Sequence, residues 1–532
     1  MQKAAVGYAI GKLMQVMGLF LLVPMVIAVY DNFHLSLEEM LVEGEVVGFG
    51  IAILISLLVG TQMVVAFRSA QYLQGIKEGY AIVTFGWLGL ALISSIPLLS
   101  YFIAGDPSGW PNFFAHFTDA YFEIMSGFTT TGATILTDIE SVPRSMLFLR
   151  SLTHWLGGMG IITLAIVVFP AMGVYGYQMF RGEVPGPTKE RLYPRLTQTA
   201  SVLWGVYLLL SAIETVLLWV GGMNLFDAVC HTFATMATGG FSTRNASIAA
   251  FESDFIEWVI TVFMFFAGIN FLVHFRAMRG DFRILTKNRE FTFYLTVIVL
   301  AIAVITGVLY FKGPAPAEQA ALSFRHEPMS TDAFVEHYVN ESNKVESLYD
   351  SFRVASFQAL SMVTTTGFVT ADFDLWPDFI RFTLVLLMFF GGCAGSTGGG
   401  MKMIRVLMVG KIVMNELRKL TQPRLVSPVK VGDDSVDDRR IINVVSFVIL
   451  FVALFIITGG LMLLFVPDLT TAVTCSIATI GNIGPGLAGV GAIENYGWIP
   501  IPGKWILVFS MLLGRLEILT VIILLRPSVW RK

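Results

Sequence analysis

The sequence predicts an all-α polytopic membrane protein: two N-terminal spans followed by four pseudo-symmetric units. Three observations lead to this prediction, namely the composition, about ten long apolar stretches, and a short segment that recurs four times. Of the 532 residues, 55% are hydrophobic and only 14% are charged, and the mean hydropathy is +0.72. Soluble domains carry roughly a quarter charged residues, so a single water-soluble globule of this size is excluded.

The charge balance and the cysteines exclude further classes of protein. The 35 Lys and Arg residues nearly balance the 38 Asp and Glu residues, which leaves a net charge of -3. Such a near-neutral chain is not expected to bind nucleic acid. The three cysteines, Cys230, Cys393 and Cys475, form no CxxC pair and no even set. Neither a disulfide framework nor a zinc site is therefore expected.

About ten stretches are long and apolar enough to cross a bilayer, which takes about 20 residues at about 1.5 Å of rise each. Two of these contain charged residues: Leu196–Trp219 holds Glu214, and Trp505–Leu525 holds Arg515 and Glu517. Because no small-residue cleavage site follows the first stretch, we expect a retained anchor and not a signal peptide. The stretches without Asp, Glu, Lys or Arg are Leu13–Tyr30, Val46–Phe67, Gly79–Gly105, Ser151–Phe180, Trp258–Phe275, Thr292–Phe311, Phe382–Met401 and Ile441–Pro467.

The connecting segments differ in charge, which predicts the orientation. Lys and Arg collect in residues 181–195, 276–289 and 402–440, whereas residues 31–45 and 313–350 are acidic. Basic loops stay on the cytoplasmic side of a membrane. We therefore expect the three basic segments and both termini to be cytoplasmic.

Between some of the spans lie apolar segments too short to cross a membrane, each ending in a polar turn that contains glycine. The first and third are closely similar, as Ser126-x-x-Thr-Thr-Thr-Gly132 and Ser361-x-x-Thr-Thr-Thr-Gly367. An alanine precedes the turn glycine by twelve residues in three segments and by eleven in the second. Repeats at such a long period indicate duplicated membrane hairpins. The four turns read Thr129-Thr130-Thr131-Gly132, Met236-Ala237-Thr238-Gly239, Thr364-Thr365-Thr366-Gly367 and Gly481-Asn482-Ile483-Gly484.

Four such turns, entering the membrane from the outer side, can converge on one axis and form a central pore. Irregular backbone survives at membrane depth only where it is buried in protein or lines a water-filled path. Rings of carbonyl oxygens can replace the water around a cation, and glycine adopts the φ values that such a backbone needs. The alternative for any single turn is an ordinary extracellular connection, but four turns with matched flanks favour the pore. The expected cation-binding residues are Thr130, Thr131, Gly132, Thr238, Gly239, Thr365, Thr366, Gly367, Asn482, Ile483 and Gly484.

From about Gly79 to Trp530 the sequence resembles the Trk/Ktr/HKT superfamily of potassium transporters, most of all its bacterial TrkH/TrkG type. The resemblance rests on the four turns, on the glycine-rich run Gly391–Gly400 and on Gly514-Arg515-Leu516-Glu517 in the last span. It implies potassium uptake through a single-chain pore in the bacterial inner membrane, with K+ as the transported ion and no organic cofactor on this chain. It also implies a homodimer. The full TVGYG filter of potassium channels is absent from every turn.

Two features are candidates for a gate. Residues Gly395, Ser396, Thr397, Gly398, Gly399 and Gly400 have poor helix propensity in the middle of a span, and in the family such a loop obstructs the pore. The alternative is a helix-packing face of small residues. Arg515 lies ten residues into its span, where an unpaired charge faces a polar path more readily than lipid. It either repels cations below the filter or forms a structural ion pair with Glu517 or Glu214.

A cytosolic partner is expected for the segment Met403–Arg440, which is basic and then acidic. By resemblance, such loops dock a TrkA-like cytosolic nucleotide-binding regulatory subunit; the alternative is a solvated loop that obeys the positive-inside rule. The run Gly486–Gly491 lacks the strand and helix of a nucleotide-binding motif, so nucleotide is expected on the partner only.

The expected units are an N-terminal two-span region (1–72) and four pore repeats (73–182, 183–285, 286–425 and 426–532). The third repeat carries an extracellular insertion. Two competing functions remain: a potassium symporter coupled to protons or sodium, and a membrane enzyme. The sequence has no paired nucleophile and base, which argues against the enzyme.

Overall fold

The computed structural model describes residues 1–34, 44–68, 75–106, 112–158, 160, 196–320, 325, 330–422, 429–431 and 434–530. In these residues the secondary structure is almost entirely helical, which confirms the expected all-α polytopic fold. The strands of the described part, β1 (Lys430–Val431) and β2 (Asp434–Ser435), pair as one short antiparallel ribbon. The helices are α1 (Lys3–Phe20), α2 (Leu22–Asp31), α4 (Glu45–Ala66), α5 (Ile76–Gly105), α6 (Phe113–Phe128), α7 (Arg144–Gly158), α9 (Leu196–Val220), α10 (Leu225–Met236), η3 (Ser247–Phe251), α11 (Asp254–Ala267), α12 (Phe271–Met278), α13 (Arg283–Lys287), α14 (Arg289–Lys312), α15 (Ala317–Ala320), α16 (Thr331–Asn343), α17 (Leu348–Val363), η4 (Phe373–Leu375), α18 (Asp378–Met388), α19 (Met403–Thr421), α20 (Asp438–Met462), α21 (Leu469–Ile480), η5 (Ala488–Val490), α22 (Ile501–Arg515), α23 (Leu519–Ile522), η6 (Ile523–Leu525) and α24 (Pro527–Trp530).

Six described helical stretches are long and apolar enough to cross a membrane, and two bent pairs of helices raise this number to eight. The bends correct two of our expectations. The stretch Trp258–Phe275 turns by 101° between α11 and α12, and Trp505–Leu525 turns by 107° after α22. Glu517 and Ile518, which follow α22, have positive φ values of 56° and 44°, and a helix cannot continue through them.

A third expected span, Phe382–Met401, is not a continuous helix. Helix α18 ends at Met388, and the chain has no helix from there until α19 begins at Met403. The physical reason is the run of glycine, serine and threonine, which are poor helix formers. The expected span Ser151–Phe180 begins in α7, but most of it lies outside the described residues, as does the basic segment 181–195.

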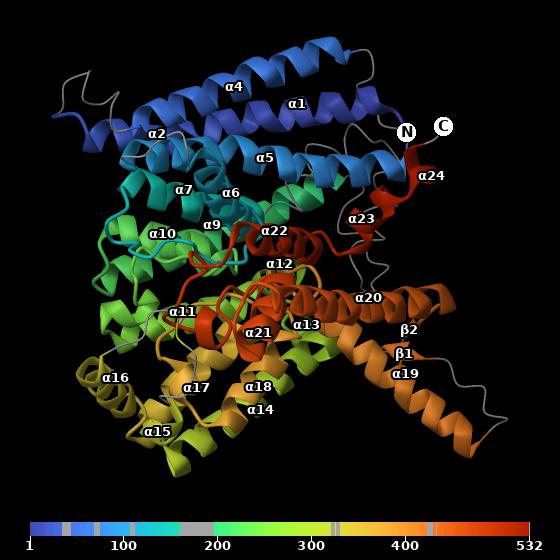
Figure 1. The fold of residues 1–532 in the computed structure, drawn as a ribbon. Coiled ribbons are helices and arrows are strands. Elements are labelled where there is room, and N and C mark those ends of the chain that lie inside the picture. Colours follow the sequence, from blue (N-terminus) through green and yellow to red (C-terminus); the bar gives the residue numbers. More distant parts are fainter. Residues whose placement is uncertain are drawn as a thin grey trace.

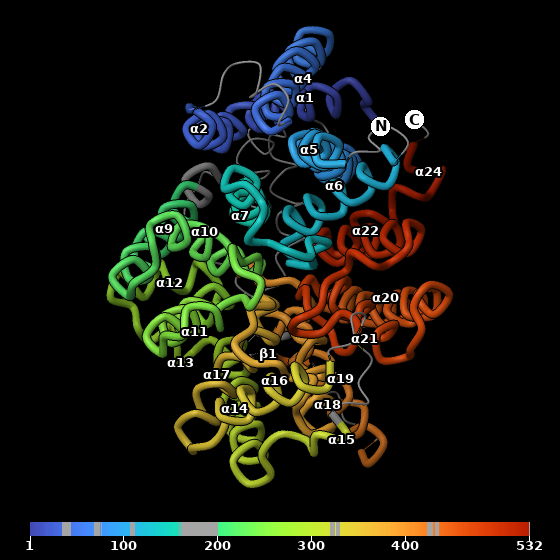
Figure 2. The backbone as a smooth tube through the Cα atoms, turned by 60° about the vertical axis from the view of Figure 1, so that its left-hand side comes forward, coloured from blue at the N-terminus to red at the C-terminus, as the bar shows by residue number. Residues whose placement is uncertain are grey.

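The helices form four groups around a centre, in chain order (Figure 2): α5–α7, α9–α12, α14–α18 and α20–α22. The groups meet in a repeating way. In each group we name the helix that follows the short helix the second helix; these are α7, α11, α18 and α22. Each second helix contacts the short helix of the next group: α7 packs on α10, α11 on α17, α18 on α21, and α22 on α6. The last contact closes the circle, and it places the short helices on the inside.

The N-terminal helices α1, α2 and α4 lie outside this circle, with α1 and α4 against α5 and α2 against α7 (Figure 1). Helices α1 and α4 approach closely because glycine faces glycine. A Cβ atom at Gly11 would lie 2.8 Å from the carbonyl oxygen of Gly60, and one at Gly60 would lie 2.8 Å from that of Gly11. Close backbone contact through small residues is typical of helix pairs in membranes.

Candidate functional site

The four short helices α6, α10, α17 and α21 each end in a tight turn with a shared backbone geometry. We name residues 129–132, 237–240, 364–367 and 481–484 the first, second, third and fourth turns. Each turn has two residues of positive φ, two positions apart. They are Thr130 and Gly132 (51° and 80°), Thr238 and Gly240 (53° and 79°), Thr365 and Gly367 (60° and 81°), and Asn482 and Gly484 (54° and 100°). Positive φ is strained for threonine and asparagine, so the surrounding protein must hold the turns in shape.

The second turn corrects one of the expected residues. We expected Gly239 to correspond to Gly132, but the positive φ belongs to Gly240. The hydrogen bonds agree: the N–H of Gly239 donates to the oxygen of Ala234 (2.8 Å), as the N–H of Thr131 donates to Ser126 (2.9 Å), each five residues back. Gly239 therefore corresponds to Thr131, Thr366 and Ile483. The alanine spacing contained this signal, because Ala228 lies twelve residues before Gly240.

The four turns touch one another in a closed ring. A side chain at Gly132 would overlap the carbonyl oxygen of Gly239, and one at Gly240 would overlap that of Thr366. In the same way Gly367 lies against Ile483, and Gly484 lies against Thr131. Each positive-φ glycine thus abuts the middle residue of the next turn, and the fourth turn returns to the first. Glycine is required at these positions both for its φ and for the close approach.

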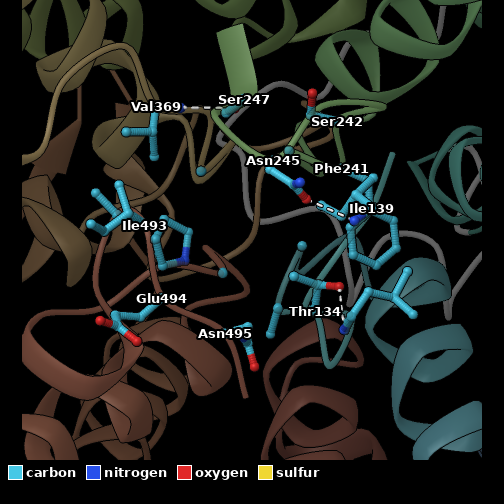
Figure 3. Close-up of a pocket in the computed structure, with 18 of the residues that line it drawn as sticks. Thr134, Ile139, Phe241, Ser242, Asn245, Ser247, Val369, Ile493, Glu494 and Asn495 are labelled. Atoms are coloured by element: carbon cyan, nitrogen blue, oxygen red, sulfur yellow. Dashed lines mark hydrogen bonds between the residues drawn. The ribbon is translucent and has the colours of Figure 1, made fainter. Parts of the chain in front are cut away.

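A cavity of about 110 Å³ opens on one side of this ring, and all four glycines, Gly132, Gly240, Gly367 and Gly484, line it. Its walls come from the segments that leave the turns (Figure 3). These segments are tied to one another: the side-chain oxygen of Asn245 accepts from the N–H of Ile139 (2.7 Å), and that of Ser247 accepts from the N–H of Val369 (3.2 Å). We name this cavity the vestibule; hydrogen bonds between different helix groups join its walls.

Below the turns, the four second helices have matching sequences at or just after the last residues that are described as helix. The sequences are His154-Trp-Leu-Gly157-Gly158, Met264-Phe-Phe-Ala267-Gly268, Met388-Phe-Phe-Gly391-Gly392 and Met511-Leu-Leu-Gly514-Arg515. Gly157 and Gly514 lie against carbonyl oxygens at equivalent places, those of Phe128 and Ile480. Arg515 therefore occupies the position at which the other three helices have glycine.

Residues 389–402, which we name the connecting loop, lie against the turns on the side of the helix ends. The N–H of Gly399 donates to the hydroxyl of Thr365 in the third turn (2.7 Å). The hydroxyl of Thr397 donates to the carbonyl oxygen of Met236, just before the second turn (2.9 Å). A Cβ atom at Gly399 would meet Gly481 of the fourth turn. The predicted residues Gly395–Gly400 are thus brought directly against three of the four turns.

Arg515 joins this loop to the first group of helices. Its side chain is buried, and it donates to the carbonyl oxygens of Thr397 (2.7 Å) and Gly157 (2.8 Å). The expected alternative, an ion pair with Glu517 or Glu214, does not occur among the described ion pairs; Glu517 pairs with Arg405 instead. Arg515 is a buried cation held by backbone oxygens.

A buried carboxylate that the sequence did not indicate ties the middle of the connecting loop to the start of α19. The Oε1 atom of Glu290, at the start of α14, accepts from the N–H of Ala394 (2.6 Å) and from that of Ile404 (3.1 Å). Within the loop, the Nζ atom of Lys402 donates to the oxygen of Gly398. The loop is therefore closed on itself at its base.

Two aspartates stand behind the vestibule, between the third turn and α18. Asp372 accepts from Arg325 (2.8 Å) and His337 (3.0 Å); burial opposes its charge, but these two partners outweigh burial and lower its pKa. Asp374 accepts from the N–H of Ala488 (3.0 Å). Burial, and then the charge of Asp372, raise the pKa of Asp374 to about 7.

In the described part of the chain, no three His, Cys, Asp or Glu side chains are placed to hold a metal ion. The polar atoms at the ring are backbone carbonyls, threonine hydroxyls and the Asn482 amide. Such weak neutral oxygen ligands suit a cation that binds and leaves again, because conduction requires that binding be reversible.

Comparison with known proteins identifies the family of this chain. A family model for TrkH, described as a cation transport protein, matches residues 47–532. The chain belongs to the TrkH family. Its resemblance to the Trk type is thereby confirmed, and so is its class as a transport protein and not an enzyme. A multi-pass membrane protein follows from the family together with the apolar helices.

Two curated members of the family are similar over most of their length. The Trk system potassium uptake protein TrkH of Escherichia coli is 36% identical over 458 residues, 86% of each chain. The protein of the same name from Halomonas elongata is 38% identical over 489 residues, 91% of this chain and 92% of that one. The crystal structure of the potassium transporter TrkH from Vibrio parahaemolyticus has a TM-score of 0.80 at 32% identity, with 100% of both chains covered.

Proposed function

We propose that this chain takes up potassium ions across the bacterial inner membrane through a pore whose cation filter is the ring of four turns. The observation that carries the proposal is the closed ring itself, in which Gly132, Gly240, Gly367 and Gly484 each lie against the next turn. A ring of four equivalent backbone segments has one axis, and an ion on that axis meets all four at once. The names of the relatives, as potassium uptake proteins, support potassium as the ion.

The chemistry of the ring favours a cation over an anion or a neutral solute. Four helices point their C-terminal ends toward the ring, and each end carries roughly half a negative charge. Carbonyl and hydroxyl oxygens of the turns replace the water of the ion. The residues assigned to this role are Thr130, Thr131, Gly132, Thr238, Gly239, Gly240, Thr365, Thr366, Gly367, Asn482, Ile483 and Gly484.

The gate in this proposal is the connecting loop together with Arg515. Residues Gly395–Gly400 lie under three turns, and Arg515 ties the oxygen of Thr397 to Gly157 across the centre. A permanent cation under a cation filter repels the ion that leaves it. Opening requires that Arg515 release Thr397 and that the loop withdraw.

Control by a TrkA-like cytosolic nucleotide-binding subunit, a homodimeric state and cytoplasmic termini complete the proposal. The connecting loop continues directly into α19, the helix of the basic segment 402–440, so a partner that moves α19 moves the loop. The four pore repeats are the units given above. The relatives' names and the described residues contribute no support for coupling to a proton or sodium gradient.

The test is ion flux through the purified chain in liposomes, with Gly367→Ser as the filter variant. A side chain at Gly367 overlaps Ile483, so we expect a potassium-to-sodium permeability ratio lower by about tenfold, or about 1.4 kcal/mol. Gly307→Ala in α14, where a Cβ atom meets nothing within 4 Å, is the matched control. An unchanged ratio in Gly367→Ser would disprove the filter assignment. A wild-type reversal potential that follows only the potassium gradient excludes the symporter.

A further inference from the structure

Behind the second turn stands a column of three flat side chains. The guanidinium of Arg150 lies 4.1 Å from the centre of the Phe241 ring, and Phe241, visible in Figure 3, stacks on His154 at 4.1 Å and 10°. The imidazole of His154 lies against the backbone of Gly239, where a Cβ atom would overlap Nδ1. All three side chains are buried. We name Arg150, Phe241 and His154 the stacked column.

The other three turns are held by side-chain hydrogen bonds between residues at least two positions apart, whereas in the second turn the hydroxyl of Thr238 donates only to the carbonyl oxygen of its neighbour Ala237 (2.6 Å). The hydroxyls of Thr129 and Thr131 bond to each other in the first turn (2.8 Å). Those of Thr364 and Thr366 do the same in the third turn (2.8 Å). The Asn482 amide of the fourth turn donates to the hydroxyl of Thr131 (3.0 Å) and to the oxygen of Met511 (2.9 Å).

In the second turn the equivalent positions are Ala237 and Gly239, which have no hydroxyl. The strained Thr238 (φ 53°) therefore has no hydroxyl pair beside it. What lies against this turn instead is the imidazole of His154. The stacked column takes the place that side-chain hydrogen bonds take in the other turns.

The identity of the residue at position 154 supports this substitution. The equivalent residues on the other second helices are Met264, Met388 and Met511, all buried. Methionine is a flexible filler of irregular space, whereas imidazole is rigid and flat. Both ring nitrogens of His154 lack a hydrogen-bond partner within the described residues. A buried polar group without a partner costs free energy, so simple packing would favour methionine here as well.

Arg150, at the end of the column away from Gly239, is itself held in place, so the column can fix the position of the second turn. The Nε of Arg150 donates to Glu123 (2.7 Å) and its Nη1 to the oxygen of Ser242 (3.2 Å). Glu123 also accepts from Thr134 (2.9 Å), which follows the first turn. The column thus connects the second turn to the segment after the first turn through the buried ion pair between Arg150 and Glu123.

We infer that His154 is a positioning residue for cation specificity, which fixes the second turn in the ring through the stacked column. This inference rests on the proposed filter. Discrimination between potassium and sodium depends on the spacing of oxygens around the ion. Gly239 and His154 form a size-matched pair, and together they set where the oxygens of the second turn stand.

The test measures the potassium-to-sodium permeability ratio from reversal potentials in proteoliposomes. We expect His154→Ala to lower the ratio by about tenfold and His154→Phe, which keeps the stack, to stay within about twofold of wild type. His154→Met, the residue of the other three helices, loses the flat contact and lowers the ratio. His116→Ala is the matched control, because His116, near the start of α6, bonds to Asp106 after α5, at the opposite end of α6 from the first turn.

A double-mutant cycle separates the stack from general damage. Gly239→Ala alone drives a methyl group into the imidazole and lowers the ratio. In the His154→Ala background the same methyl group has room, so the double variant is no less selective than His154→Ala. If the double variant loses as much selectivity as the two single variants added together, Gly239 and His154 are not a size-matched pair. If His154→Ala is not monodisperse in detergent, the contrast between His154→Phe and His154→Met decides the question.

The outcomes also separate this inference from the proposed function. If Gly367→Ser lowers the ratio but His154→Ala and His154→Met do not, the filter stands and the role of His154 is refuted. If Gly367→Ser leaves the ratio unchanged, the filter itself is refuted, whatever the histidine variants do.

Discussion

The guanidinium of Arg515 donates a 2.7 Å hydrogen bond to the carbonyl oxygen of Thr397, a residue 118 positions earlier in the chain. This bond connects α22 to the connecting loop, and a further bond from the same side chain reaches the carbonyl oxygen of Gly157. One cation thus holds together parts of three helix groups beneath the ring. Its position is the one that glycine occupies in the other three second helices.

Replacing Arg515 by alanine should open the closed pore. The change removes two charge-assisted hydrogen bonds, each worth about 1.5–3 kcal/mol, and also removes the repelling charge. We expect basal potassium flux in liposomes to rise at least about tenfold. Arg526→Ala, an exposed arginine beyond the span, should leave the flux unchanged. Equal fluxes in Arg515→Ala and wild type would refute a gating role.

Replacing Glu290 by alanine should free the middle of the connecting loop from the start of α19. The N–H groups of Ala394 and Ile404 lose their shared acceptor, at about 1 kcal/mol for each hydrogen bond. We expect faster amide exchange in residues 394–404 and a several-fold rise in basal flux. Glu290→Gln keeps an acceptor oxygen and should have the smaller effect. Glu416→Ala on α19, which removes only an exposed pair with Lys419, is the control; unaltered exchange in Glu290→Ala contradicts the prediction.

Replacing Gly240 by alanine should disrupt the ring. The residue has a φ of 79°, and a Cβ atom there overlaps the carbonyl oxygen of Thr366. We expect loss of potassium selectivity, measured as the permeability ratio, in a protein that still migrates as a single species in detergent. Gly222 also has a positive φ, of 107°, but nothing lies within 4 Å of its Cβ position. Gly222→Ala therefore carries the backbone strain without the overlap, and it should keep the ratio. A ratio lost equally in both variants would show that φ alone matters.

The stability of the protein should fall as the pH rises from about 4 to about 7 because of Asp374. Its folded-state pKa of about 7 lies above the ordinary value near 3.9. The folded state therefore binds the extra proton between about pH 4 and pH 7, and stability is lost as the pH rises through this range, by up to about 1.4 kcal/mol per pH unit. Thermal midpoints in detergent between pH 5 and pH 8 measure the slope. Asp374→Asn, which keeps an acceptor for Ala488, should flatten it; an identical slope in both proteins would exclude Asp374 as the cause.

The location of the ring could be predicted from the sequence because each turn is a local pattern. Hydroxyl residues before a glycine, at the end of an apolar segment too short to span, repeat closely in Thr129–Gly132 and Thr364–Gly367. The register of the second turn could not be read from this pattern. Gly239 and Gly240 are adjacent, and the pair Thr238-Gly239 wrongly matches Gly239 to Gly132 of the first turn. The constant distance of twelve residues from Ala228 contained the right answer.

The run Gly395–Gly400 indicated locally that the span Phe382–Met401 is interrupted, although the helix already ends at Met388. The bends after α11 and α22 and the contacts of Glu290 and His154 lie beyond such local patterns. The bonds of Glu290 to Ala394 and of Arg515 to Thr397 join residues more than 100 positions apart. Such pairs depend on how four helix groups meet in space, and a single sequence does not encode them as a spacing.

The contact between Gly484 and Thr131 has a consequence for biogenesis. It is the last of the four contacts to form during synthesis, since 352 residues separate Gly132 from Gly484. Until the fourth turn has been made and inserted, three turns face an unfilled quadrant and the helices around them have no partner on that side. Ring closure is thus a late, long-range folding step of the kind that is slow, and a chain truncated before residue 484 cannot close the ring.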